Sequence, residues 1–177
     1  STLTTPESIE SFRAQFTEPA MSELAVAGIE VFEHLGDVIG IPGFDISIRH
    51  QGYLFVTDDA AMVKDLKSAV DKHHSLGATS SEFLDHDELL ARFPYLSDAV
   101  VGATFCQRDG WLSTHEVTQG FAKGSNARFL VDTRATGIEQ DTGHAGGARG
   151  VSAVETTRGT ISTRLVVNAA GPFAGTV

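Results

Sequence analysis

The first 126 residues alternate between stretches whose apolar side chains have helical spacing and stretches where they have strand-like spacing. The longest stretch comes first, and its apolar residues recur at roughly helical spacing: Ile9, Phe12, Phe16, Leu24, Ile29, Phe32 and Leu35. Thr5 is a suitable N-cap, with Pro6 at the first helical position. The pattern predicts a helix from Pro6 to about Leu35, broken at Pro19 and ended by Gly36.

Shorter segments follow, and they are separated by Gly, Pro and Asp residues typical of turns and helix caps. Alternating apolar residues predict strands over 44–48, 51–56, 81–84 and 99–106, of which the first two are alternatively one strand bent at Gly52. Helical spacing predicts helices over about 59–76, over 86–93 with Asp85 as N-cap, and from Ser113 onward.

The pattern changes after Gly124, where short strands are separated by Gly-rich turns. Strands are predicted over 127–131, 136–139, 151–155 and 160–162, with a loop at 143–150 and a tight turn at 158–159. The apolar run Leu165–Val167 predicts a buried strand that leads into the small residues Asn168–Gly171. Small residues at a strand end let the backbone approach a ligand closely, as nucleotide-binding turns require.

The order of these elements predicts an α+β fold in two parts. Residues 1–126 are expected to form a helix-backed mixed or antiparallel sheet, and residues 127–177 a β-meander joined to the buried strand. The chain has 177 residues, of which 41% are hydrophobic and 20% charged, as in ordinary globular proteins.

Charge and composition exclude several classes of function. The net charge is −10 and Lys and Arg form no stripe, so no nucleic-acid partner is expected. No run of 18 apolar residues predicts a membrane span. A single cysteine, Cys106, excludes an internal disulfide and a multi-Cys metal site. The N-terminus has no signal-peptide pattern, so a cytoplasmic origin is expected. It also lacks an initiator Met, which is typical of a processed or excised segment.

Several motifs together resemble FAD-dependent amine oxidoreductases, the D-amino-acid-oxidase superfamily, particularly its branch acting on sarcosine, dimethylglycine and glycine. The motifs occur in the same order as in that family: Arg13-Ala-Gln-Phe16, His50-Gln-Gly-Tyr-Leu-Phe55, Leu89-Leu-Ala-Arg-Phe-Pro-Tyr-Leu96, Gly102-Ala-Thr-Phe105, Asp109-Gly-Trp-Leu112 and Val167-Asn-Ala-Ala-Gly-Pro-Phe-Ala-Gly175. The resemblance implies FAD as cofactor and oxidation of the C–N bond of a small amine or amino acid. It makes residues 1–126 a substrate-side segment and 127–177 part of a Rossmann-like FAD-binding half.

The family pattern is incomplete in this sequence. No GxGxxG turn occurs among the 177 residues, and the acidic residue that would bind the adenosine ribose is missing. The family's C-terminal part, which supplies much of the flavin and substrate site, is missing as well. The resemblance therefore implies a middle fragment, and we expect the isolated chain neither to bind FAD tightly nor to turn over.

The resemblance also implies which residues meet the cofactor. The backbone at Ala135 is expected to contact the adenine, and the turn of Ala169, Ala170 and Gly171 to lie near the phosphates and ribose. Phe173 occupies a position that is often aromatic in the family. Considered by itself, the turn is more readily interpreted as an ordinary strand exit with small side chains, and the resemblance reverses this preference.

Other polar residues have a functional and a structural interpretation. Arg49 and His50, beside Tyr53 on a predicted strand, are candidates for binding a substrate carboxylate, although an exposed edge strand with ordinary polar residues is the favoured interpretation. Helix capping explains His115 and Glu116, and Cys106 is interpreted as inert filler.

No metal site is expected from the histidines. Neighbouring His73 and His74 diverge on a helix, so a solvated helix face is the better interpretation, and the pairing of His34 with Glu33 suggests a metal only superficially. The acidic cluster of Asp85, Asp87 and Glu88 complements a helix dipole. The catalytic residues stay unassigned.

Two other functions remain open. The chain could be a non-catalytic ligand-binding or assembly domain, whose exposed apolar face would drive homo-oligomerisation. It could also be a relative of another FAD dehydrogenase with the same fold, such as a glycerol-3-phosphate dehydrogenase. The sequence does not distinguish O2 from an electron-transfer partner as acceptor, nor covalent from dissociable flavin.

Overall fold

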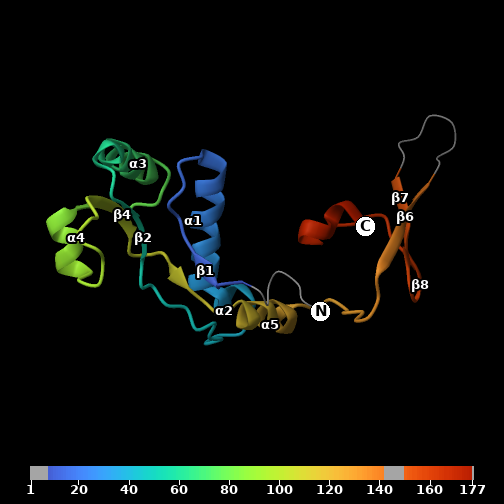
Figure 1. Ribbon diagram of the computed structural model, residues 1–177. Coiled ribbons are helices and arrows are strands. Elements are labelled where there is room, and N and C mark those ends of the chain that lie inside the picture. Colours follow the sequence, from blue (N-terminus) through green and yellow to red (C-terminus); the bar gives the residue numbers. More distant parts are fainter. Residues whose placement is uncertain (1–7, 142–149, 177) are drawn as a thin grey trace. The chain divides into compact units, whose positions relative to one another are not determined.

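The computed structural model describes residues 8–141 and 150–176 and divides into two compact units, unit 1 (residues 1–126) and unit 2 (residues 127–177). Its helices and antiparallel sheets confirm the α+β class (Figure 1). Unit 1 contains β1 (Ser11–Phe12), α1 (Pro19–Glu33), α2 (Leu35–Val38), β2 (Tyr53–Thr57), the 3₁₀ helix η1 (Ala60–Met62), α3 (Val63–Ser75), β3 (Ser81–Asp85), α4 (His86–Arg92), β4 (Gly102–Cys106), β5 (Gly110–Trp111) and α5 (Thr114–Gly124). Unit 2 contains β6 (Ala135–Asp141), β7 (Gly150–Thr156), β8 (Gly159–Ser162) and the 3₁₀ helix η2 (Gly171–Thr176).

The main sheet of unit 1 is antiparallel, with the strand order β2-β4-β3. Residues paired across its strands point to the same face, so the register defines two faces. Leu54, Leu84 and Phe105 point to one of them, which α4 covers. Phe55 and Thr104 point to the opposite face. The sheet therefore presents two chemically different surfaces.

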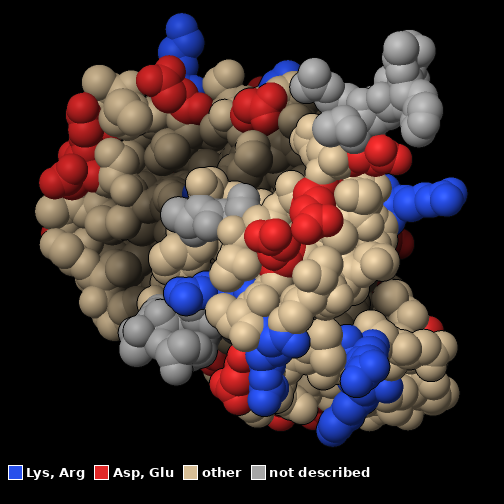
Figure 2. All heavy atoms as spheres, turned by 90° about the vertical axis from the view of Figure 1, so that its right-hand side faces the viewer, with Lys and Arg blue, Asp and Glu red and all other residues tan. Residues whose placement is uncertain are grey.

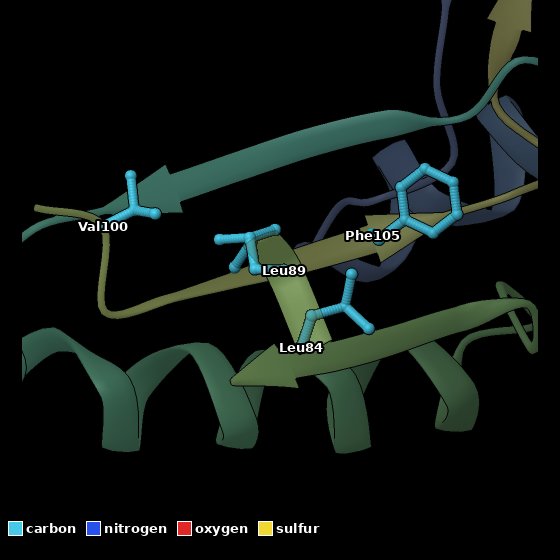
Figure 3. Packing of buried hydrophobic residues seen from close by; sticks show 5 residues of the cluster. Leu84, Leu89, Val100 and Phe105 are labelled. Carbon is cyan, nitrogen blue, oxygen red and sulfur yellow. The ribbon is translucent and has the colours of Figure 1, made fainter. Parts of the chain in front are cut away.

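The core of unit 1 lies on the face covered by α4. Leu84, Leu89, Val100 and Phe105 pack together there, as Figure 3 shows. Leu89 is completely buried and belongs to α4, whose N-cap Asp85 forms a capping box with Glu88. The predicted strand and capped helix of this region are confirmed.

Helix α1 begins later than the sequence pattern predicts. Glu18 is its N-cap and Pro19 its first residue, whereas Ser11 and Phe12 form β1, which pairs with β5. The predicted helical start at Pro6 lies outside the described residues, and a helix over residues 8–18 is wrong. Phe12 has helical spacing relative to later residues, but it lies in β1, where it is partly buried and packs against Phe32 of α1.

The strand predicted over residues 44–48 does not form. Ser47 has a positive φ of 56° and its N–H is bonded by the side chain of Asp45, so the backbone turns there. Only Arg49 makes an isolated bridge to Trp111 in this region. Strand β2 starts after Gly52, and β4 starts at Gly102, both later than predicted.

Unit 2 is built on an antiparallel meander of β6, β7 and β8. The three strands confirm the segments predicted over 136–139, 151–155 and 160–162, and a two-residue turn at Thr157 and Arg158 joins β7 to β8. The loop predicted over 143–150 lies outside the described residues, apart from Gly150 in β7.

Two predictions for unit 2 are wrong. Residues 127–131 form no strand, and Leu165–Val167 is not a buried strand, since Leu165 is 77% and Val167 81% exposed. A strand needs a neighbouring backbone to bond with. The unit's described sheet ends at β8, and neither apolar run pairs with it. These runs therefore have no strand partner, and most of their large side chains are exposed to solvent.

Candidate cofactor and substrate site

The small-residue turn of unit 2 is organised by the side chain of Asn168. Its Oδ1 accepts the N–H of Ala170 at 3.1 Å, and its Nδ2 donates to the carbonyl of Ala174 at 2.8 Å. These bonds connect the turn to η2. Gly171 has a φ of +55° and its Cα faces open space, so the backbone here is accessible.

The structure brings four of the five predicted cofactor residues together in this turn. Ala169 and Gly171 are exposed and Ala170 is half-buried, while Phe173 is half exposed on η2. All four belong to unit 2 and follow the exposed segment 165–167. The turn is thus open to solvent and has no side chain large enough to obstruct a ligand at its centre.

Ala135 lies at the start of β6, beside an irregularity of the meander. It pairs with Thr156, the next pair is Gly137 with Glu155, and the register shifts between them. Such a bulge leaves the backbone of Thr136 outside the regular ladder. An exposed backbone group next to Ala135 fits the kind of contact expected for an adenine. Together with the open turn, it makes unit 2 compatible with a dinucleotide held largely by the backbone.

Unit 1 contains a cation that the sequence did not single out as a site residue. The guanidinium of Arg13 lies over three aromatic rings, 4.7 Å from the centroid of Phe16, 5.1 Å from Phe55 and 5.9 Å from Tyr53. Its Nε is buried without a hydrogen-bond partner, and no described carboxylate forms an ion pair with it. Arg13 is therefore a fixed cation whose hydrogen-bonding capacity is not fully used.

A buried network fixes the backbone beside Arg13. The completely buried Asp109 accepts the N–H of Ala14 at 2.7 Å and the Nε2 of Gln15 at 3.1 Å. Gln15 Oε1 in turn accepts the hydroxyl of Thr104 on β4 at 2.7 Å. Burial raises the pKa of Asp109, and the bonds from Ala14 and Gln15 and the charge of Arg13 oppose that shift.

The three substrate-side candidates lie in different surroundings. Tyr53 joins Arg13 on the face opposite α4. Arg49 is exposed, and its Nη1 donates to the carbonyl of Ile48. His50 lies in a polar cluster with Glu33 and Arg108. The structure therefore brings only Tyr53 to the cation of Arg13.

The His50 cluster connects α1 to the turn after β4. Arg108 donates two hydrogen bonds to Glu33, of 2.9 and 2.5 Å, and this pairing lowers the pKa of Glu33. His50 Nδ1 lies 2.5 Å from the carbonyl of Arg108, and its Nε2 lies 3.4 Å from Glu33. These contacts give His50 a role in holding the fold together.

An aromatic pocket of about 440 Å³ lies near the beginning of β2. It is lined by Gln51, Gly52, Tyr53, Leu54, Phe93, Tyr95 and Phe105. None of these side chains is charged, so the pocket has no group that could neutralise the carboxylate of an amino acid. The surface around Arg13 has that capacity.

The remaining candidates are engaged in structural contacts. Cys106 is completely buried, and burial raises the pKa of its thiol, which disfavours the nucleophilic thiolate. Ser113 caps α5 by accepting the N–H of Glu116 at 3.2 Å. His73 is buried and bonded to Ser81 at 2.9 Å, so a solvated helix face is wrong for this residue. Within the part of the chain that the structure describes, no group of side chains has the arrangement of a metal site.

Arg13 was missed because its significance depends on the tertiary fold. Arg13 lies in the motif Arg13-Ala-Gln-Phe16, but Phe55 and Tyr53 are about forty positions away in the sequence, on β2. The available signal was an arginine beside a phenylalanine in a motif shared with the family. Asp109 belongs to another of these motifs, and its hydrogen bonds to Ala14 and Gln15 show that the Arg13–Phe16 motif also stabilises the fold.

Comparison with known proteins assigns the family. The profile of the family described as FAD dependent oxidoreductase, DAO, matches residues 6–177, and the chain belongs to this family. No curated protein sequence matches the chain significantly. Membership identifies FAD as the family's cofactor.

Solved structures share the fold. L-proline dehydrogenase from P. horikoshii has a TM-score of 0.84 and 23% identity, over 99% of this chain and 45% of that one. Glycine oxidase from Bacillus cereus has a TM-score of 0.77 and 22% identity, over 98% of this chain and 46% of that one. L-amino acid deaminase from Proteus myxofaciens has a TM-score of 0.75 and 20% identity, over 94% and 37%. The chain thus spans less than half the length of these proteins.

Proposed function

We propose that the chain is part of an FAD-dependent oxidoreductase that oxidises the C–N bond of a small amine or amino acid. The observation that carries this proposal is the family match over residues 6–177. The similar structures are described as a proline dehydrogenase, a glycine oxidase and an amino acid deaminase, and all of these names refer to an amino acid substrate. In such an enzyme FAD would supply the redox chemistry, and the protein would position the substrate and the cofactor.

We assign different tasks to the two units. Unit 2 would contact the adenine through the backbone at Ala135, and the phosphates and ribose through the turn of Ala169, Ala170 and Gly171, with Phe173 beside it. The open backbone of that turn and the bulge after Ala135 support this assignment. Neither feature needs a particular side chain, which suits a contact made by backbone groups.

Unit 1 would supply the substrate side, with Arg13 as its central cation. A guanidinium held over three rings keeps its position, and its N–H groups can donate hydrogen bonds to the carboxylate of an amino acid. Tyr53 is the only one of the sequence-derived substrate candidates beside it. Arg49 and His50 would stay outside the site.

The test uses the longest open reading frame that contains this sequence. The protein is expected to purify with FAD, and anaerobic addition of glycine, sarcosine or L-proline is expected to bleach the flavin absorbance. Replacement Arg13→Gln should slow this reduction about tenfold or more while the FAD content stays unchanged, because a charge-assisted hydrogen bond to the substrate is lost. A protein that binds no flavin, or one whose flavin no amine or amino acid reduces, contradicts the proposal.

Arg92 provides a matched control for Arg13. It also lies over two rings, those of Phe93 and Phe105, but it belongs to α4 and is paired with Glu82 at 2.7 Å. Arg92→Gln is expected to leave the rate of flavin reduction within about twofold of the unmodified protein, because its charge is already paired. Equal effects of the two replacements would remove Arg13 from the substrate site.

The 177-residue chain by itself is expected to behave differently. It has no GxGxxG turn to hold a pyrophosphate, so we expect FAD to bind it more weakly than micromolar and no turnover to occur. Titration of flavin fluorescence measures this affinity. Tight binding would show that the backbone sites of unit 2 suffice without that turn.

An assembly role is the second candidate. It is favoured by the large apolar side chains that unit 2 exposes, among them Phe129, Val131 and Val167. A discrete dimer without affinity for flavin would support it. Within the described residues, no helix has both the length and the apolar character needed to cross a membrane.

A further inference from the structure

The two units differ in charge far more than in size. Residues 127–177 carry five Arg and four Asp or Glu, whereas residues 1–126 carry eight Lys or Arg and 19 Asp or Glu. Unit 2 is therefore the only part of an acidic chain that does not repel anions by its own net charge. Figure 2 shows several Lys and Arg side chains close together on the surface that faces the viewer.

A groove of about 320 Å³ in unit 2 concentrates this charge. It is lined by Arg128, Leu130, Thr133, Thr156, Arg158, Gly159, Thr160 and Ile161. The lining contains two guanidinium groups, three hydroxyls and no carboxylate. Its volume lies in the range of small-molecule sites.

The hairpin between β7 and β8 holds one of the two arginines in place. Thr156 Oγ1 accepts the N–H of Arg158 at 3.1 Å and donates to the carbonyl of Gly159, which has a φ of +120°. Arg158 Nη1 reaches the carbonyl of Val131 at 3.3 Å, across to the segment that forms the opposite wall. The long side chain of Arg158 is thus anchored beside the groove, and its other N–H groups stay available.

In the described ranges, Arg128 and Arg158 form no ion pair, although the sequence has 23 acidic residues. The hydroxyl of Thr160 has no described partner either. Leu130 and Ile161 add an apolar surface on the same groove. The lining therefore offers two cations for an anionic group and an apolar wall for the body of the same ligand.

We propose that this groove binds a nucleoside monophosphate, with the phosphate between Arg128 and Arg158 and the nucleoside against Leu130 and Ile161. A phosphate monoester carries nearly two negative charges at neutral pH, and guanidinium forks match its oxygens. A monocarboxylate would leave one of the two cations unpaired. The site goes beyond the proposed oxidoreductase function, because it needs neither substrate nor flavin chemistry.

The experiment titrates the 177-residue chain with AMP, adenosine and inorganic phosphate, following backbone amide shifts by NMR. AMP is expected to bind saturably with shifts centred on residues 156–161, and adenosine to bind at least about tenfold more weakly, since the phosphate supplies the charge-assisted bonds. Raising the salt concentration should weaken the binding of AMP because the groove is open to solvent.

Charge-matched variants separate this site from general attraction. R128Q and R158Q are each expected to weaken AMP binding about fivefold or more, because each removes one guanidinium from the phosphate. R164Q removes the same charge from the same unit outside the groove lining, and it should change the affinity less than about twofold. All three residues are exposed, so unfolding is not expected, and circular dichroism checks this.

Several outcomes overturn the proposal. These are the absence of saturable AMP binding, equal effects of R158Q and R164Q, and equal affinity for adenosine and AMP. Competition with FAD identifies the source of the phosphate. If FAD displaces AMP, the groove takes the adenosine phosphate end of the dinucleotide, and if both bind together, it takes a free nucleotide. Failure of AMP to bind leaves the flavin reduction test unaffected, so the two proposals fail independently.

Discussion

Unit 1 buries apolar side chains in three clusters, whereas unit 2 leaves most of its large apolar side chains in solvent. In unit 1, residues such as Ile29, Leu35 and Leu89 are almost inaccessible. Among the buried hydrophobic residues of the described chain, Ala153 is the only member from unit 2. A segment of about fifty residues rarely builds a sufficient core of its own.

This difference in packing shows how the three proposed binding regions are held in place. Arg13 is held by a sheet and by the buried Asp109, so its position depends on the core of unit 1. The turn around Gly171 depends on local bonds from Asn168, and the groove at Arg158 on the β7–β8 hairpin. The proposed site in the packed unit thus depends on tertiary packing, whereas the proposed sites in the open unit depend on local turns, which position backbone groups and the side chain of Arg158.

Removal of a core side chain should give the largest effect and should be confined to unit 1. Leu89→Ala creates a cavity in the cluster of Figure 3, and we expect it to reduce the free energy of unfolding by about 3 kcal/mol. Chemical denaturation followed by the fluorescence of Trp111, the only tryptophan, measures this loss in unit 1. Leu165→Ala, at a side chain that is 77% exposed, is the matched control and should change it by less than about 0.5 kcal/mol. Similar losses for both would show that Leu165 contributes to the stability of unit 1, contrary to the prediction.

The buried carboxyl of Asp109 should make the stability of unit 1 depend on pH. Its pKa is raised in the folded chain, mainly by burial, so folding favours the protonated form. The stabilisation is fully present below the pKa of the unfolded chain, and it is lost as pH rises through the folded pKa. Asp109→Asn keeps an acceptor for the N–H of Ala14 and cannot ionise.

The comparison of the two proteins across pH isolates this residue. The quantity to compare is the free energy of unfolding of the unmodified protein minus that of Asp109→Asn. This difference should fall as the pH rises from about 4 to about 7, because only the unmodified protein must ionise a buried carboxyl group. The subtraction removes the opposite contribution of Glu33, whose pKa is lowered by Arg108. A difference that stays constant or rises with pH would show that the network stabilises the ionised form of Asp109.

Local signals predicted the fold where sequence neighbours determine it. Asp85 predicted the start of α4, Ser113 the start of α5, and the turn at Arg158 the β7–β8 hairpin. These structures need only capping or turn chemistry, which the sequence shows directly. The α+β class followed from the same segments.

The predictions from sequence were wrong where contacts between distant residues determine the local structure. Phe12 has helical spacing, but its pairing through β1 with β5, about a hundred positions away, determines its conformation. Leu165–Val167 has the composition of a buried strand, but a strand forms only where another backbone is available to it. The resemblance predicted the family and the turn near Gly171, because both depend on short sequence motifs. The position of Arg13 over Tyr53 and Phe55 depends on contacts between distant residues, so only the structure shows it.

The smallest effect on stability is expected from the exposed tail of unit 2, which tests whether this open surface drives association. Leu165→Ser with Val167→Ser should change the free energy of unfolding of unit 1 by less than about 0.5 kcal/mol, because both side chains lie in solvent. Light scattering over a range of concentrations should show weaker self-association, since the replacements remove two large apolar side chains from the exposed surface. A matched variant, Met62→Ser, removes an exposed apolar side chain from unit 1 and should leave association unchanged. If the double variant associates as strongly as the original chain, the contact lies elsewhere, and the exposed apolar run of unit 2 has no part in it.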